Sequence, residues 1–310
     1  MEEQRDATRR LALERLSPAL GAEVTGFDAR DLDSPALAPF LHRALLDHQL
    51  LLLRGVDLDP VTFRRLGAHL GPLRRVPDGM QVEPGMPEVQ RLTNLGANGE
   101  PTGINPDPYS MQWHTDGSAA RIPSRYTLLY AVHVPEEGGA TSFVNMYAAC
   151  AGLSPARRRA LVGRLAIHEP EIARYFRHGK PIAPADASPL RGLRMRVRLV
   201  RRMLSSRTAR HPVIRMHEET GRPCLFIGDH AWRVTGWWWP AGARLANALN
   251  TFATTNSEWT YTHFWQVGDL IIWDNRCLLH RGSEYDAARE ERVMLRAVVN
   301  GECVPIAAGA

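Results

Sequence analysis

Long apolar runs, closely spaced cysteines and lysines are scarce in this chain of 310 residues. No apolar run reaches the roughly 18 residues that a membrane-spanning helix requires. The first ten residues are charged and no apolar stretch follows them, so the sequence predicts no secretory signal peptide. The four cysteines, Cys150, Cys224, Cys277 and Cys303, form no C-x-x-C pair and are typical of reduced thiols. Together these absences predict a soluble, cytoplasmic protein.

Several common catalytic motifs are also missing. The only lysine, Lys180, follows Gly179 but lacks the G-x-x-x-x-G-K-[ST] pattern of a phosphate-binding loop. No G-x-G-x-x-G follows a predicted strand, and no G-x-S-x-G is present. The sequence therefore argues against phosphate-loop hydrolysis, hydride transfer on a dinucleotide fold and the commonest serine chemistry.

Positive charge is concentrated in one stretch of the chain. Residues 157–215 contain 16 basic and 3 acidic residues, a net charge of +13, whereas the remainder has a net charge of −8. Such a segment attracts anionic partners, nucleic acid included. Because no nucleic-acid motif accompanies the charge, the sequence favours a solvated arginine face and predicts neither a nucleic-acid nor a membrane partner.

The expected elements are short strands with flanking helices. Ser34-Pro35 and Asp59-Pro60 each combine an N-cap residue with a proline at the first helical position. Residues 74–110 are rich in Pro, Gly and Asn without a sustained period, which predicts a long loop acting as a lid. Apolar runs predict strands over 49–53, 126–134, 141–145, 224–227, 259–263, 270–273 and 292–299.

A helical insertion is expected over residues 153–211. Within it an apolar stripe recurs at helical spacing, beside a stripe of arginines. The apolar stripe is Leu190, Leu193, Val197, Val200 and Leu204, and the arginines are Arg191, Arg194, Arg198 and Arg201. We expect this helix to close a barrel. Non-sequential strands with inserted helices favour a mainly β fold, a double-stranded β-helix (jelly-roll) barrel in one catalytic domain over 1–310.

The strongest functional signal is His114-Thr115-Asp116, followed 166 residues later by His280. On a strand, His114 and Asp116 would share one face, because side chains alternate with a period of two. His280 from a distant strand would complete two imidazoles and one carboxylate. This is the facial ligand set of non-haem Fe(II) sites, which leaves positions open for substrate and oxygen. An ordinary imidazole–carboxylate pair is the alternative for His114 and Asp116.

Six segments in their order along the chain resemble the taurine dioxygenase and 2,4-dichlorophenoxyacetate dioxygenase family of Fe(II)/2-oxoglutarate enzymes, over about residues 16–300. They are Trp113-His114-Thr115-Asp116, Gly138-Gly139-Ala140-Thr141, His211-Pro212-Val213, Ile272-Trp273-Asp274-Asn275-Arg276, His280-Arg281 and Arg292-Val293-Met294-Leu295-Arg296. The resemblance implies that His114, Asp116 and His280 bind Fe(II), which reacts with O2. It also implies that Thr141 and Arg292 bind the distal carboxylate of 2-oxoglutarate.

Two arginines near the end of the chain support this independently. Arg292 and Arg296 are four residues apart and would point into the barrel, with Val293 and Leu295 on the opposite face. A buried guanidinium needs an anion, and its planar fork matches a carboxylate. Arg296 is predicted to hold the cosubstrate or an acidic group of the substrate. Because the preceding segment is one residue longer than in the relatives, Arg289 is an alternative to Arg292.

Two further residues are predicted to contact the substrate. His230, in Gly228-Asp229-His230-Ala231, matches a family segment near the substrate, with a structural histidine as the alternative. Trp237, in a run of three tryptophans, is expected to stack on a ring-bearing substrate, with ordinary packing as the alternative. Thr141 has its own alternative, a strand threonine without a ligand.

These observations predict an oxygenase that hydroxylates an unactivated C–H of a small anionic substrate and releases succinate and CO2. The alternative is a catalytically inactive barrel that binds an anionic partner through its arginine-rich insertion. A zinc-dependent hydrolase on the same ligands is weaker, because no general-base carboxylate lies beside the motif. The sequence identifies neither the prime substrate nor the oligomeric state, and a homo-oligomer stays open.

Overall fold

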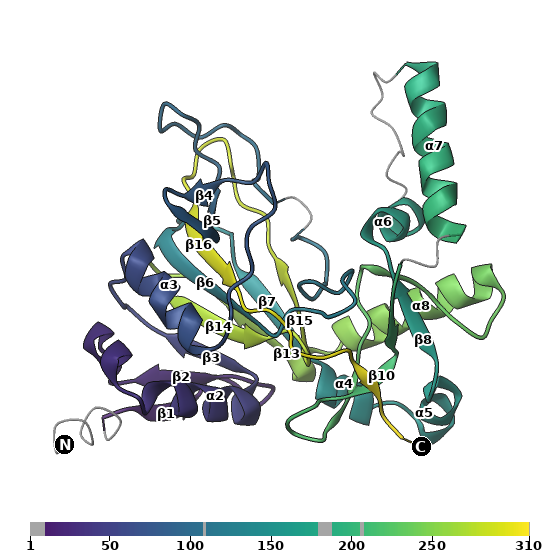
Figure 1. Ribbon diagram of the computed structural model, residues 1–310, viewed down its shortest axis with the longest axis horizontal. Coiled ribbons are helices and arrows are strands. Elements are labelled where there is room, and N and C mark those ends of the chain that lie inside the picture. Colours follow the sequence, from purple (N-terminus) through teal and green to yellow (C-terminus); the bar gives the residue numbers. More distant parts are fainter. Residues whose placement is uncertain (1–9, 108–109, 179–187, 205–207, 310) are drawn as a thin grey trace. The chain divides into compact units, whose positions relative to one another are not determined.

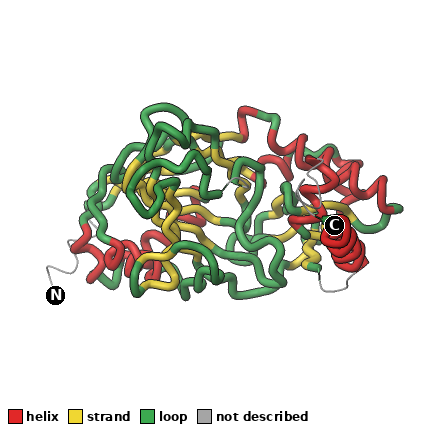
Figure 2. The backbone as a smooth tube through the Cα atoms, turned by 90° about the horizontal axis from the view of Figure 1, so that it is seen from above, coloured by secondary structure: helices red, strands yellow, loops and turns green. Residues whose placement is uncertain are grey.

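The structure is a computed structural model that describes residues 10–107, 110–178, 188–204 and 208–309. It contains two compact units, coloured along the sequence in Figure 1. Unit 1 comprises residues 1–112, 124–145 and 257–302, and unit 2 comprises 113–123, 146–256 and 303–310. Loops, green in Figure 2, connect most of the elements. Within the described ranges, no helix has the length and apolar content needed to cross a membrane.

Unit 1 is built on two β-sheets. The larger has eight strands in the order β1-β2-β3-β14-β6-β16-β5-β4, and the smaller has the order β13-β7-β15. The strands are β1 (Ala12–Arg15), β2 (Ala22–Thr25), β3 (Leu50–Leu53), β4 (Val82–Glu83), β5 (Met86–Thr93), β6 (Tyr126–His133), β7 (Thr141–Asn145), β13 (Thr260–His263), β14 (Leu270–Asp274), β15 (Leu278–Gly282) and β16 (Val293–Val298). The helices are η2 (Ala29–Asp33), α2 (Leu37–His48), α3 (Pro60–His69) and η3 (Ser257–Trp259). Most of the predicted strands are confirmed within one or two residues.

The helices α2 and α3 cover one face of the eight-stranded sheet (Figure 1). Both bury an apolar stripe in the main hydrophobic core, which also contains Leu128, Tyr130 and Leu295 from the sheet. The predicted start of α3 is confirmed, because Asp59 Oδ1 accepts a hydrogen bond from Thr62 N at 2.6 Å. The predicted cap at Ser34 is wrong: α2 begins at Leu37, since residue 34 ends the 3-10 helix η2.

The sequence predicts that the segment 74–110 is a long irregular loop, and this prediction is wrong for part of the segment. Residues 82–83 and 86–93 form β4 and β5, and β5 pairs with β16 from Val293↔Thr93 to Arg296↔Gln90. The strand was missed because Pro87 and polar residues interrupt its apolar alternation. Pairing with a distant strand, rather than its own pattern, stabilises it. The lid role of the segment stays a prediction.

The two sheets of unit 1 contact each other through aromatic rings. Trp273 on β14 packs against Phe143 on β7, with ring centroids 5.4 Å apart in a T-shaped arrangement. It also lies 4.7 Å from the ring of His280 on β15. The face of the larger sheet that lies opposite α2 and α3 therefore meets the smaller sheet.

Unit 2 combines two three-stranded sheets with helices. The sheets have the orders β12-β8-β9 and β11-β10-β17. The strands are β8 (Leu165–His168), β9 (Ala209–Pro212), β10 (Ile214–Met216), β11 (Pro223–Leu225), β12 (Ala231–Val234) and β17 (Ile306–Ala307). The helices are α4 (Met146–Ala151), α5 (Pro155–Leu161), α6 (Pro170–His178), α7 (Pro189–Leu204) and α8 (Trp239–Thr254). The lone Lys180 lies outside the described residues.

The amphipathic helix of the insertion is present as α7, but its predicted packing face is wrong. Leu199 and Met203 pack against Ile172 and Trp232 in a small core of unit 2. The predicted stripe is exposed instead, with 58% of Leu193 and 43% of Val197 accessible. Only a few side chains of α7 enter this core, among them Leu199 and Met203. The contacts with α6 therefore selected the buried face of α7, and the apolar periodicity of the helix did not. The four cysteines carry no disulfide, as expected.

Candidate active-site residues

His114 and Asp116 lie close together in unit 2, although not on a strand. His114 forms an isolated β-bridge and residues 116–119 form a turn, so the two side chains do not alternate along one strand as predicted. His114 Nε2 and Asp116 Oδ1 are 3.8 Å apart, beyond hydrogen-bond distance, and both side chains are buried. The turn brings the imidazole and the carboxylate together, which a strand would have achieved by alternation. A buried pair of this kind fits two ligands of a divalent metal.

His230 lies directly beside this pair. Its ring centroid is 5.4 Å from that of His114, and its Nδ1 is 3.0 Å from the hydroxyl of Ser118. Burial, together with the adjacent His114, lowers the pKa of His230 to about 3. The imidazole is therefore neutral at physiological pH. The sequence analysis does not single out Ser118, although it follows His114 by only four residues.

His280 lies on β15 of unit 1, as predicted. Its register partner across the three-stranded sheet is Phe143 on β7, and the two rings are stacked with centroids 6.1 Å apart. The ring of Trp273 also lies 4.7 Å from that of His280. The imidazole is buried and its orientation is set by two aromatic neighbours on regular strands.

Thr141 shares a sheet face with His280. Directly opposed residues of antiparallel strands point to the same side, and Thr141 is two residues from Phe143, which opposes His280. Trp265 Nε1 donates a 2.9 Å hydrogen bond to Thr141 Oγ1. The hydroxyl proton of Thr141 is thereby left to donate to another acceptor.

A double-glycine turn precedes Thr141. Gly138 has φ +81°, and a Cβ there would lie 2.3 Å from the carbonyl oxygen of Glu284. The next residue, Gly139, donates its N–H to that same oxygen at 3.1 Å. Only glycine permits this close approach, which joins the start of β7 to the segment after β15.

The two candidate cosubstrate arginines differ sharply in their surroundings. Arg289 has 84% of its side chain exposed and lies 3.8 Å from Asp286. Burial lowers the pKa of the Arg292 guanidinium, while the nearby Tyr285 and Asp107 raise it. The Arg292 guanidinium also lies 5.9 Å from the ring of Tyr285. Arg292 is therefore the more buried of the two arginines, and its role in binding the cosubstrate stays a prediction.

Arg296 points to the face of the eight-stranded sheet that meets the smaller sheet. It opposes Leu129 on β6, and Trp273 opposes Thr127 two residues away on the same strand. Arg296 and Trp273 therefore share one face. Leu295 lies on the other face, in the core beneath the helices. The predicted alternation is confirmed for Leu295 and Arg296, whereas Arg292 precedes β16 and the pairing of β16 with β6 is irregular between Val293 and Met294.

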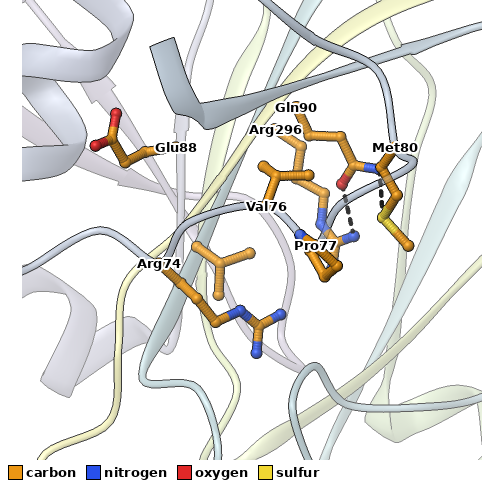
Figure 3. A pocket seen from close by; sticks show the side chains of 8 residues that line it. Arg74, Val76, Pro77, Met80, Glu88, Gln90 and Arg296 are labelled. Atoms are coloured by element: carbon orange, nitrogen blue, oxygen red, sulfur yellow. Dashed lines mark hydrogen bonds between the residues drawn. The ribbon is translucent and has the colours of Figure 1, made fainter.

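A small cavity in unit 1 is lined by Arg296 (Figure 3). Its volume is about 80 Å³, and its other lining residues are Arg74, Val76, Pro77, Met80, Glu88, Gln90 and Val298. Arg296 Nη1 donates to Gln90 Oε1 at 3.4 Å. The carboxylate of Glu88 points away from both guanidinium groups in Figure 3 and is bound by Arg64 at 3.0 Å. The cavity is therefore electropositive.

Trp237 is half-buried at the turn between β12 and α8. The guanidinium of Arg164 lies 5.1 Å from its ring centroid, a cation–π contact. The following tryptophans are exposed, Trp238 at 68% and Trp239 at 48%. A structural contact thus accounts for the position of Trp237, and its substrate role stays a prediction.

Comparison with known proteins places these residues in a family. The family model described as "Taurine catabolism dioxygenase TauD, TfdA family" matches residues 12–298. The alpha-ketoglutarate-dependent 2,4-dichlorophenoxyacetate dioxygenase of Cupriavidus pinatubonensis is 29% identical, over 89% of this chain and 93% of that protein. Pentalenolactone F synthase of Streptomyces arenae is 30% identical, over 90% and 89%.

Further relatives extend this comparison. The alpha-ketoglutarate-dependent sulfate ester dioxygenase of Pseudomonas putida is 28% identical over 93% of this chain and 88% of that protein. A crystal structure of AAD-2 in complex with Mn(II) and N-oxalylglycine has a TM-score of 0.75, with 25% identity and coverage of 96% and 98%. Because the family model spans nearly the whole chain, the protein belongs to the TauD/TfdA family of dioxygenases.

Proposed function

We propose that this protein is an Fe(II)- and 2-oxoglutarate-dependent oxygenase in which His114, Asp116 and His280 bind the iron. The proposal depends chiefly on one observation: a chain that matches the TauD/TfdA family model over residues 12–298 contains His114, Asp116 and His280 as buried side chains. Two imidazole nitrogens and one carboxylate are a donor set suited to Fe(II). When bound, iron with 2-oxoglutarate and O2 supplies the oxidation of a C–H bond to an alcohol, with release of succinate and CO2.

Thr141 and Arg292 are proposed to bind the distal carboxylate of 2-oxoglutarate. Arg292 offers a planar fork that matches a carboxylate with two hydrogen bonds, and burial strengthens that attraction. Thr141 can add a third hydrogen bond, because Trp265 already supplies the one that its hydroxyl oxygen accepts. The cosubstrate would then be oriented by a strand residue and by an arginine next to β16.

We propose that the prime substrate is a small anionic molecule held by Arg296. Arg74 and Arg296 line a cavity of about 80 Å³ whose carboxylate, Glu88, is bound by Arg64. A water molecule needs about 10–15 Å³, so this space suits an acidic group rather than a whole substrate. His230 and Trp237 are the further candidates for substrate contact. Relatives named for acting on 2,4-dichlorophenoxyacetate and sulfate esters are consistent with an acidic substrate.

We also propose that the protein has a jelly-roll fold and lies in the cytoplasm. The contacts of Trp273 with Phe143 and His280 support a jelly-roll barrel, since they join the two sheets of unit 1 face to face. Reduced cysteines support a cytoplasmic location. A homo-oligomer is compatible with both.

The test is succinate release that depends on Fe(II) and 2-oxoglutarate, measured with acidic substrates and with their neutral analogues. We expect turnover that is largest with a carboxylate, sulfonate or sulfate ester. The rival function, an inactive barrel, predicts no succinate and binding of anionic polymers to the arginine-rich segment. Hydrolysis that needs Zn²⁺ but not 2-oxoglutarate would instead support a zinc-dependent hydrolase on the same ligands.

A further inference from the structure

Residues 113–118, which contain His114 and Asp116 and are called the His114–Asp116 turn below, are held at both ends by hydrogen bonds to the main chain. At one end the backbone N–H of Asp229 donates to the carbonyl oxygen of Trp113 at 2.7 Å. At the other end Nε2 of His211 lies 2.9 Å from the carbonyl oxygen of Ser118, so this nitrogen carries the proton and donates. Both contacts lie within unit 2. They bracket the two candidate ligands on either side.

The segment that supplies the first contact is itself held by an arginine. Arg177 on α6 donates through Nη1 to the carbonyl oxygen of Gly228 at 2.9 Å and to Asp229 Oδ1 at 3.3 Å. Its other terminal nitrogen, Nη2, donates to the carbonyl oxygen of Ala231 at 2.5 Å. The side chains of Arg177 and Asp229 are only 8% and 4% exposed. One guanidinium thus spans three acceptors around residues 228–231.

The same segment presents a second group to the turn. In the sequence, His230 lies between Gly228 and Ala231, whose carbonyl oxygens Arg177 binds. The ring of His230 contacts both Ser118 and His114. Fixing residues 228–231 therefore fixes an N–H that binds Trp113 and an imidazole that packs on a candidate ligand. The apolar core beneath α6, formed by Ile167, Ile172 and Trp232 among others, is a separate set of contacts.

We propose that Arg177 is a positioning residue, which orients the His114–Asp116 turn through the backbone and the imidazole of residues 228–231. The inference rests on the proposed function, because it assumes that this turn binds the metal. A guanidinium is suited to the role, since its fixed fork can hold several carbonyl oxygens at once. A lysine ammonium at this place would keep the charge but could not reach all three acceptors.

The test compares Arg177→Lys with Arg202→Lys. Arg202 is the control on α7: it is part-buried and its guanidinium pairs with two carboxylates, Glu169 at 3.1 Å and Glu171. Glu169 reaches residue 230 through its backbone N–H, so Arg202→Lys changes a side-chain pair and leaves that backbone contact in place. Amide hydrogen exchange is measured on metal-free protein, and the affinity for Co²⁺ by calorimetry. In Arg177→Lys we expect exchange at residues 113–118 and 229 to rise at least tenfold. Co²⁺ affinity should fall roughly 10- to 100-fold, as for other residues that orient ligands. Both readouts should be unchanged in Arg202→Lys.

Unchanged exchange at 113–118 in a folded Arg177→Lys protein would overturn the proposal, whatever the protein does with metal. Absence of Co²⁺ binding by the unsubstituted protein would instead overturn the proposed function, while the exchange result still decides whether Arg177 orders the turn. If Arg177→Lys does not fold, Ser118→Ala replaces it, because this change removes only the hydroxyl contact with His230. We then expect a smaller loss of Co²⁺ affinity, about threefold, and equal affinity would contradict the proposal.

Discussion

The candidate metal ligands come from two regions that hold their side chains by different means. His280 stands on β15, where strand pairing sets its place and the rings of Phe143 and Trp273 set its orientation. His114 and Asp116 lie in the segment 113–118, whose main chain accepts hydrogen bonds from Asp229 and His211 at its two ends. Strand pairing and ring packing therefore hold the strand ligand, whereas hydrogen bonds to the main chain contribute to holding the other two. Substitutions around the turn should therefore change metal binding more than stability.

The largest expected effect is the loss of a ligand. His114→Ala, Asp116→Ala and His280→Ala should each lose stoichiometric Fe(II) and turnover while the protein remains folded, because each removes one donor of three. Iron content after desalting and succinate release provide the measurement. Normal iron retention and activity in any of the three would remove that residue from the site.

Two of these variants also test the comparison between the strand and the turn through their free energies of unfolding. His280→Ala should lower the free energy of unfolding by about 1–3 kcal/mol, because it leaves a gap beside Trp273 and Phe143. His114→Ala should cost less, because the His114 ring packs on the smaller imidazole of His230. Urea unfolding of the metal-free proteins measures both. Equal losses would show that the turn is packed as firmly as the strand.

The next effect concerns 2-oxoglutarate. Arg292→Ala should raise the KM for 2-oxoglutarate by about 30-fold or more, since losing a charge-assisted contact to a buried carboxylate costs on the order of 2–5 kcal/mol. The KM for the prime substrate should change much less. Arg289→Ala is the matched control, because its side chain is 84% exposed, and its kinetics should be unchanged. A reversed pattern would identify Arg289 as the cosubstrate ligand.

A smaller effect is expected at the cavity in Figure 3. Arg296→Ala should weaken binding of the acidic substrate roughly 10- to 100-fold, the usual loss for a hydrogen bond to a charged group. It should also release succinate without product, because a poorly anchored C–H is no longer oriented for oxidation. Arg43→Ala, which removes an exposed ion pair with Asp47 on α2, is the control. A neutral best substrate, or full coupling in Arg296→Ala, would make Arg296 structural.

The smallest effect compares a helix cap in each unit. Asp59 accepts from Thr62 N at the start of α3, and Ser154 accepts from Arg157 N at the start of α5. Each replacement by alanine should cost about 1 kcal/mol and leave metal affinity unchanged. The backbone hydrogen bond from Thr62 lowers the pKa of Asp59 below 3.8. Its contribution is therefore complete above pH 3.8 and is lost as the pH falls through the lowered value.

The Ser154 cap carries no charge. The stability that it contributes should therefore not fall as the pH is lowered from 6 into the range where Asp59 is protonated. Thermal unfolding of the two variants and the parent protein across this range measures the difference. An Asp59→Ala effect that is as large in acid as at neutral pH would show that the carboxylate is not the capping group.

Local patterns in the sequence were sufficient to predict the class of reaction and most of the strands. The order of His114, Asp116, Thr141, His280 and Arg292 along the chain indicated the family, because ligand type and spacing depend on covalent sequence. Alternation between Leu295 and Arg296 predicted which face each would occupy, since side chains on a strand alternate whatever surrounds them.

Contacts between distant segments decided what local patterns could not. The strand β5 exists because β16 pairs with it, and the turn at residues 116–119 replaced a predicted strand. The exposed stripe of α7 has the periodicity of a buried face, yet Leu199 and Met203 make the packing contacts. Arg177 shows no sequence signal at all, because its three acceptors lie more than fifty residues away. The sequence by itself determined the donor groups and the regular strands. The tertiary structure alone decided which residues hold those donors in place, since that depends on pairings between segments far apart in the chain.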